Sequence, residues 1–175
     1  MVRLSNKTSS ANNREDDSMQ NITPCLWFDT DGEDAANFYT SIFPNSKIGH
    51  IERYGSAGPR PEGTVMTVSF ELDGMEFLAL NGGPQFEFSE AISFQVSCKN
   101  QDEVDKYWSE LSEGGEEGPC GWLKDKFGLS WQIVPTALPE LLSNPDKEKA
   151  QRVMAAMLEM KKIEIDELER AAAAA

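Results

Sequence analysis

The first half of the chain alternates apolar and polar positions in a way that predicts four strands and one helix. Residues 22–28 form an apolar run bounded by turn residues, which is typical of a buried strand. The stretch 35–43 carries apolar residues at helical spacing and ends at Pro44. Asp73-Gly74 is a strong hairpin signal. It joins the last two of three further predicted strands, at 47–54, 64–72 and 77–81.

The second half repeats this order of elements. Residues 91–98 alternate as a strand, and a helix follows with its apolar positions between 104 and 111. The glycine pair at 114 and 115 ends that helix, and 120–134 is predicted to form a hairpin. The first strands of the two halves start about seventy residues apart, which is the spacing of an internal repeat.

The pattern divides the chain into a tail, two modules and a helical extension. Residues 1–18 lack the apolar core of a secretory signal, and we predict a disordered N-terminal tail there. Two modules, at about 22–83 and 90–135, form one domain over 19–135. Helical spacing in 136–175 predicts C-terminal helices. The fold class is therefore α+β, with tandem βαβββ modules.

Charge and cysteine content limit the partners and the compartment. The 175 residues carry a net charge of −14, which would repel nucleic acid and anionic membranes. No apolar run reaches the length of a membrane span. Cys25, Cys98 and Cys120 contain no C-x-x-C pair, so we expect reduced thiols in a cytoplasmic protein.

Five sequence blocks resemble the PhnB-like branch, labelled 3-demethylubiquinone methyltransferase-like, of the vicinal-oxygen-chelate superfamily. That superfamily includes glyoxalase I, bleomycin-resistance proteins and extradiol dioxygenases. The blocks are TPCLWFD (23–29), AANFYTSIFPNS (35–46), ALNGGP (79–84), EAISFQV (90–96) and GWLKDKFGLSWQIVP (121–135). The resemblance implies curved mixed sheets around a cavity and a homodimer. It does not imply methyl transfer, because Gly82-Gly83-Pro84 connects two strands and leads into no helix that could bind a nucleotide phosphate.

The resemblance also implies four cavity positions for metal ligands, at the first and last strands of both modules. Aligning the strands puts Thr23, Ala79, Ala91 and Gln132 at these positions. Divalent metals prefer imidazole or carboxylate, which none of these residues offers. His50, the only histidine, lies on a different strand. We therefore expect neither a metal nor another cofactor.

Small polar residues recur on one face of several predicted strands, and this pattern predicts a small-molecule site. Alternatively, these residues hydrogen-bond one another across a filled interior. The candidate ligand-binding residues are Thr23, Cys25, Trp27, Thr67, Ser69, Asn81, Ser93, Gln95, Ser130 and Gln132.

Two functions remain open at this point. The first is metal-free binding of a small neutral molecule, because no Arg or Lys is assigned to the cavity. The second is an isomerase or lyase of the same superfamily, using a metal or a pocket carboxylate. Glu71 is the candidate general base for such an enzyme, although a carboxylate near a hairpin end is more commonly solvated.

Overall fold

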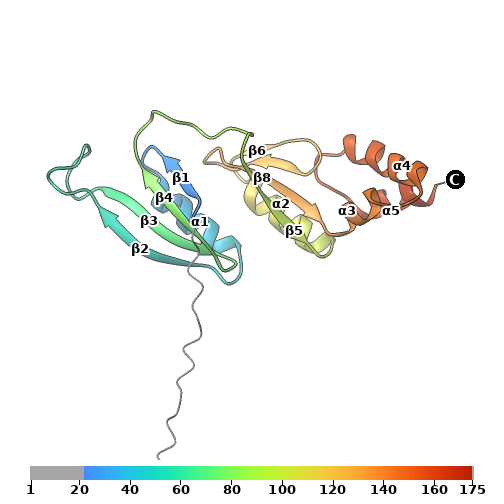
Figure 1. Ribbon diagram of the computed structural model, residues 1–175, viewed down its shortest axis with the longest axis horizontal. Coiled ribbons are helices and arrows are strands. Elements are labelled where there is room, and N and C mark those ends of the chain that lie inside the picture. Colours follow the sequence, from blue (N-terminus) through green and yellow to red (C-terminus); the bar gives the residue numbers. More distant parts are fainter. Residues whose placement is uncertain (1–21, 175) are drawn as a thin grey trace, which may run out of the picture.

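A computed structural model describes residues 22–174, and the predicted N-terminal tail at 1–18 lies outside this range. Two modules lie end to end, followed by a group of helices (Figure 1). The first module contains β1 (Cys25–Phe28), α1 (Gly32–Ile42), β2 (Lys47–Arg53), β3 (Val65–Leu72) and β4 (Met75–Asn81). The second contains β5 (Ser93–Cys98), α2 (Gln101–Ser112), β6 (Glu116–Glu117), β7 (Trp122–Lys124) and β8 (Ser130–Pro135).

The two modules have the same sheet topology, which confirms the predicted α+β repeat. The strand orders are β1-β4-β3-β2 and β5-β8-β7-β6. In each sheet the first strand of the module pairs in parallel with the last, and the other pairs are antiparallel. Among the described residues the two sheets stay separate and form no closed barrel. The two-residue strand β6 is too short to produce a hydrophobic pattern, so the sequence did not reveal it.

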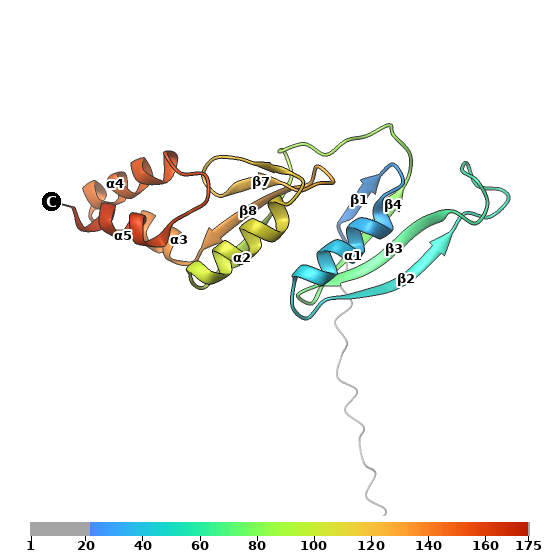
Figure 2. The same cartoon turned by 180° about the vertical axis from the view of Figure 1, so that it is seen from behind.

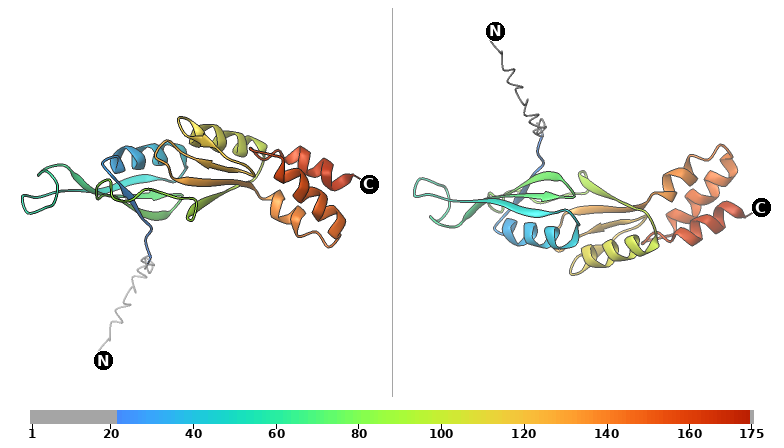
Figure 3. Two further views of the ribbon diagram at one scale, coloured as in Figure 1. Left: turned by 90° about the horizontal axis from the view of Figure 1, so that it is seen from above. Right: turned by 90° about the horizontal axis from the view of Figure 1, so that it is seen from below.

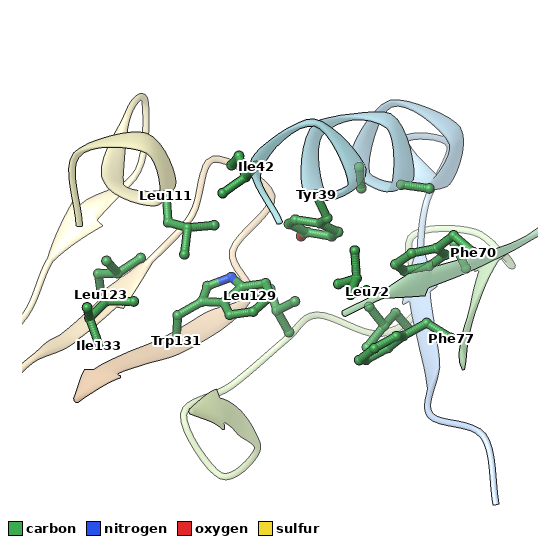
Figure 4. Close-up of a cluster of buried hydrophobic side chains, with 14 of the residues drawn as sticks. Tyr39, Ile42, Phe70, Leu72, Phe77, Leu111, Leu123, Leu129, Trp131 and Ile133 are labelled. Atoms are coloured by element: carbon green, nitrogen blue, oxygen red, sulfur yellow. The ribbon is translucent and has the colours of Figure 1, made fainter. Parts of the chain in front are cut away.

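One helix covers one face of each sheet, and both helices lie on the same side of the molecule (Figures 2 and 3). Apolar residues of α1 and of strands β3 and β4 fill the space in the first module. Leu111 of α2 and Ile133 of β8 do so in the second, and all belong to one cluster of buried side chains (Figure 4). The opposite face of each sheet has no helix on it. We call it the open face.

A buried carboxylate joins the two modules. Asp125, in the turn after β7, is 3% exposed and accepts four hydrogen bonds. The Tyr39 hydroxyl of α1 donates at 2.7 Å and the Trp131 indole N–H of β8 at 2.8 Å. The backbone N–H groups of Phe127 and Leu129 donate at 2.8 and 3.1 Å. Burial raises the pKa of Asp125, while the hydrogen bonds from Trp131 and Tyr39 act against that rise.

Aromatic stacking fixes the C-terminal end of α1 on the second module. Phe43 stacks on Tyr107 of α2 with centroids 5.3 Å apart and on Trp131 of β8 at 5.4 Å. The Lys106 ammonium of α2 donates to the carbonyl of Ile42 at 3.1 Å, at the last turn of α1. These side-chain contacts hold the two modules against each other.

The predicted C-terminal helices are present and have a small core of their own. They are α3 (Ala137–Leu142), α4 (Lys147–Leu158) and α5 (Ile165–Ala173). Val153, Ile163 and Leu168 are fully buried among them. The Gln101 side chain at the start of α2 accepts from the Ile165 N–H at 2.9 Å and donates to the Ile163 carbonyl at 3.1 Å, which attaches this group to the second module. Within residues 22–174 no helix is long and apolar enough to cross a bilayer.

The ALNGGP turn after β4 has a packing role. The Trp27 indole N–H donates to the carbonyl of Gly83 at 2.7 Å. A Cβ placed on Gly82 would lie 2.3 Å from Cζ2 of the Trp27 ring, far inside van der Waals contact. Gly82 therefore makes room for the Trp27 indole of β1.

We expect Tyr39→Phe to lower the free energy of unfolding by about 1.5–3 kcal/mol, because it removes a hydrogen bond to a buried carboxylate. Urea denaturation checks this value. Tyr107→Phe is the matched control, since the described contacts of Tyr107 are ring contacts and its hydroxyl has no hydrogen-bond partner among them. Equal stability losses in the two variants would contradict the role assigned to Asp125.

We expect Gly82→Ala to displace the Trp27 ring and to lower stability by about 1–3 kcal/mol through overpacking. The indole N–H resonance of Trp27 should shift, because its bond to Gly83 is broken. Gly55→Ala serves as the control, since a Cβ there meets nothing within 4 Å. An unshifted Trp27 resonance in Gly82→Ala would show the packing argument to be wrong.

Candidate functional site

Two rows of side chains cross the open face of the second sheet. Trp131, Ile133 and Leu123 point into the core, so their neighbours along the strands point to the other face. The backbone register aligns Ser93 with Ser130 and Ser130 with Lys124 in the first row. It aligns Gln95 with Gln132 and Gln132 with Trp122 in the second. The four predicted site residues of this module therefore share one face.

A pocket of about 370 Å³ borders the first row, next to β6 and β7. We call it the β7 pocket. This volume lies within the range of small-molecule sites. Its walls combine the Trp122 ring with polar and charged groups. The lining residues are Glu90, Glu116, Glu117, Gly118, Pro119, Trp122, Leu123, Lys124 and Ser130.

Ser130 is the unusual residue of this pocket. It has no exposed surface, and among the described residues its hydroxyl is the one buried side-chain polar group without a hydrogen-bond partner. Leaving a buried polar group unpaired costs about 1–3 kcal/mol. A ligand group that paired with this hydroxyl would recover that free energy.

Gln132 and Ser93 bond to each other. The Gln132 amide donates to the Ser93 hydroxyl at 2.8 Å. These two residues therefore hydrogen-bond each other, as the alternative interpretation expected, and one N–H of the amide is no longer free for a ligand. Gln95, opposite Gln132 on β5, is exposed.

Lys124 lies on the same face, although the sequence analysis assigned no basic residue to the cavity. Its ammonium pairs with the Glu90 carboxylate at 2.6 Å. That hydrogen bond raises the pKa of Lys124 and lowers the pKa of Glu90. Period-two alternation from Trp122 would have found Lys124, because both lie on the open face of β7.

The predicted residues of the first module lie apart from the β7 pocket. Ser69 fills the β-bulge of β2, where its hydroxyl accepts from the His50 N–H at 2.7 Å. Thr23 and Cys25 are exposed at the start of β1, and partial burial raises the pKa of the Cys25 thiol. Thr67 is half-buried on β3.

Asn81, a predicted ligand-binding residue, does not lie on the open face and instead borders a separate cavity of about 390 Å³ next to α1. Asn81 is 4% exposed and lies on the side of α1. Its amide oxygen accepts from the Gly32 N–H at 2.8 Å, and its amide nitrogen donates to the Val65 carbonyl at 3.2 Å. It therefore stabilises the N-terminus of α1, whose backbone N–H groups lack helical partners.

Ala79, which the sequence analysis aligned with a metal position, does not lie on the open face either. Ala79 is 1% exposed and faces α1. Leu78 and Leu80 take the open-face positions of β4 instead, and neither side chain can ligate a metal. Ala91 lies in an exposed turn before β5. Within the described part of the chain, no group of three or more His, Cys, Asp or Glu side chains is arranged to hold a metal ion.

Glu71 forms an ion pair on the open face of the first sheet. Its carboxylate lies 2.8 Å from the Lys47 ammonium, and this contact raises the pKa of Lys47. A small pocket of about 150 Å³ borders the pair. Glu71 therefore belongs to a different module from the β7 pocket.

Comparison with known proteins identifies the family. The family model described as 3-demethylubiquinone-9 3-methyltransferase matches residues 20–134. No curated protein matches the chain. A PhnB protein from Bacillus cereus shares 37% sequence identity, with a TM-score of 0.60; the match covers 67% of this chain and 100% of that one.

More distant structures share the fold alone. A Pseudomonas aeruginosa protein is 18% identical with a TM-score of 0.55, and the match covers 65% of this chain and 96% of that one. The fosfomycin resistance protein FosX from Mesorhizobium loti is 14% identical with a TM-score of 0.51, covering 72% and 98% of the two chains. The βαβββ repeat and these matches agree. The chain belongs to the PhnB-like, 3-demethylubiquinone-9 3-methyltransferase family.

Proposed function

We propose that this chain binds a small organic molecule in the β7 pocket without a metal ion. The observation that carries the proposal is the fully buried, unpaired hydroxyl of Ser130 at the edge of a cavity of about 370 Å³. Unpaired buried groups of this kind are rare in native proteins and commonly mark a site where a partner is missing.

The composition of the pocket supports the proposal. Trp122 and Pro119 supply apolar surface, while Lys124 and Ser130 supply a few polar groups. This combination is typical of small-molecule sites. The expectation of a neutral ligand has lost its basis, because it depended on the absence of a basic side chain and Lys124 is present.

The enzymatic alternative has less support. Glu71, its candidate base, pairs with Lys47 in the other module. The metal positions hold Thr23, Ala91, Gln132 and a leucine of β4, a set that does not fit a divalent ion. The family description names a methyltransferase, but Gly82 and Gly83 of this chain pack against Trp27 and no helix begins between 82 and 92.

The state of the cysteines bears on the cellular compartment of the protein. Cys25, Cys98 and Cys120 are free thiols. Burial raises the pKa of Cys98 to about 11, which keeps that thiol protonated and unreactive at neutral pH. These properties support a cytoplasmic protein with reduced cysteines.

Ser130→Ala tests the proposed site. We expect the variant to be as stable as the wild type or more stable, because it removes a buried unpaired hydroxyl. We expect its affinity for fragments that bind wild-type protein to fall about fivefold, the equivalent of one hydrogen bond. A fragment screen by ligand-observed NMR finds the probes, and calorimetry in EDTA measures affinity without metal.

Ser97→Ala is the matched control, since Ser97 lies on the same face of β5 beyond the pocket. It should change neither stability nor affinity. The proposal fails if no fragment binds at millimolar concentration, or if Ser130→Ala binds every fragment as tightly as wild type. It also fails if EDTA abolishes binding.

We also propose a homodimer. Each sheet has a helix on one face only, and the open face of the first sheet carries Leu78 and Leu80. Phe86 and Ile92, between the modules, are 65% and 70% exposed. Exposed apolar surface of this kind favours association. Sedimentation velocity should find a species of twice the 19.4 kDa chain mass at micromolar concentration, and monomer alone would count against the dimer.

A further inference from the structure

We propose that the ligand of the β7 pocket is an organic cation, an ammonium group attached to an apolar body. This inference rests on the proposed function and adds the charge and chemical class of the ligand. It is carried by the distribution of carboxylates around the pocket, by the aromatic surface beside them and by the unpaired hydroxyl at its edge.

Carboxylates outnumber basic groups in the lining of the β7 pocket. Glu90, Glu116 and Glu117 line it together with a single basic residue, Lys124. Glu90 pairs with Lys124 at 2.6 Å. Glu117 lies 3.5 Å from the ammonium of Lys161, a residue that is not part of the lining. Glu116 forms no ion pair within residues 22–174, although its charge helps to raise the pKa of Lys124. The three carboxylates therefore exceed the two nearby ammonium groups, Lys124 and Lys161, by one charge.

A second cavity shares Lys124 with the β7 pocket and is also lined by carboxylates and aromatic rings. It has a volume of about 470 Å³, borders the segment that links the modules, and is lined by Lys124 as well. We call it the linker pocket. Three further carboxylates line it, Asp29, Asp31 and Glu87, of which Asp29 lies 3.2 Å from the Arg60 guanidinium. The rings of Trp27, Phe86 and Phe88 form its apolar wall.

Carboxylates next to aromatic rings favour a cation bound to an apolar group. The negative faces of aromatic rings attract cations, and nearby carboxylates add a direct Coulomb attraction. Trp122 supplies such a ring in the β7 pocket, and Phe86 contacts Trp27 edge to face at 5.0 Å in the linker pocket. A ligand spanning both pockets would place its cation near Glu116 and its body along these rings.

The Ser130 hydroxyl provides the independent observation. Ser130 lines the β7 pocket, and its hydroxyl oxygen is fully buried and lacks a hydrogen-bond partner. A hydroxyl oxygen accepts a hydrogen bond from an ammonium N–H. Such a donor would pair with the one unsatisfied buried side-chain group found in the described structure and would bring a positive charge into a pocket whose lining has an excess of carboxylates.

An anionic ligand is disfavoured by the same arrangement. Lys124 is the basic group it would use, and that ammonium is already bound to Glu90. The anion would have to displace Glu90 and would then face Glu116, the cross-strand neighbour of Lys124. The net charge of −14 adds a long-range repulsion.

Three probes with one ring system and different charges test the inference. They are naphthylmethylamine, naphthylmethanol and naphthoic acid, which are cationic, neutral and anionic at about pH 7. Calorimetry on the full-length protein should find the amine binding at least about tenfold tighter than the alcohol, and the acid weakest. Raising NaCl from about 0.01 to 0.5 M should reduce this preference.

Glu116→Gln should weaken amine binding about threefold to tenfold and leave alcohol binding unchanged, because it removes the surplus charge. Glu169→Gln on α5 is the matched control, an exposed carboxylate outside both pockets, and should change neither. Ser130→Ala should lower the affinity for the amine by a factor that does not depend on the salt concentration.

The outcomes separate this inference from the proposed function. If the alcohol binds as tightly as the amine and Ser130→Ala weakens both, the pocket binds ligands but the cation inference is overturned. If the amine binds equally well to wild type, Glu116→Gln and Ser130→Ala, it binds elsewhere and the inference is again overturned. Binding of the acid alone, or of none of the three probes, overturns it as well, and the fragment screen then decides the proposed function.

Discussion

The hydrogen bonds on the Asp125 carboxylate connect the halves of this protein and shape its candidate site. Tyr39 reaches this carboxylate from the first module and Trp131 from the second. The N–H of Leu129 closes the turn between β7 and β8 on the same group. Lys124 and Ser130, the central pair of the β7 pocket, directly flank this turn in the sequence. Loss of the carboxylate would therefore disturb module contact and pocket together.

Each sheet is covered by a helix on one face only, and this leaves the other face available for a ligand site. The faces under α1 and α2 are filled by the core, whereas no helix covers the open faces (Figure 3). In the first sheet these side chains are mostly used by the fold itself, as Ser69 in the bulge and Glu71 with Lys47 show. The second sheet retains the unpaired Ser130. For this reason the proposed site is centred on the second module.

The sequence predicted the strands and helices well because each has a regular period. It did not predict which face of strand β4 packs against the helix. In β4, Phe77 and Ala79 alternate with Leu78 and Leu80, so both faces are apolar. Alternation alone cannot decide which face meets the core in such a strand. Asn81 and Ala79 lie on the α1 side of this strand and not on the open face. Only the helix packed on one face settles the question.

The sequence by itself determined the βαβββ repeat, the helical extension, the family resemblance and the absence of strong metal donors at the aligned positions. These properties depend on local periodicity and residue identity. Tertiary structure alone decided that Asp125 collects donors from 86 residues away, that Gly82 accommodates an indole, and that Ser130 is buried without a partner. Each of these features depends on contacts between side chains from distant segments, and a local sequence pattern does not predict such contacts.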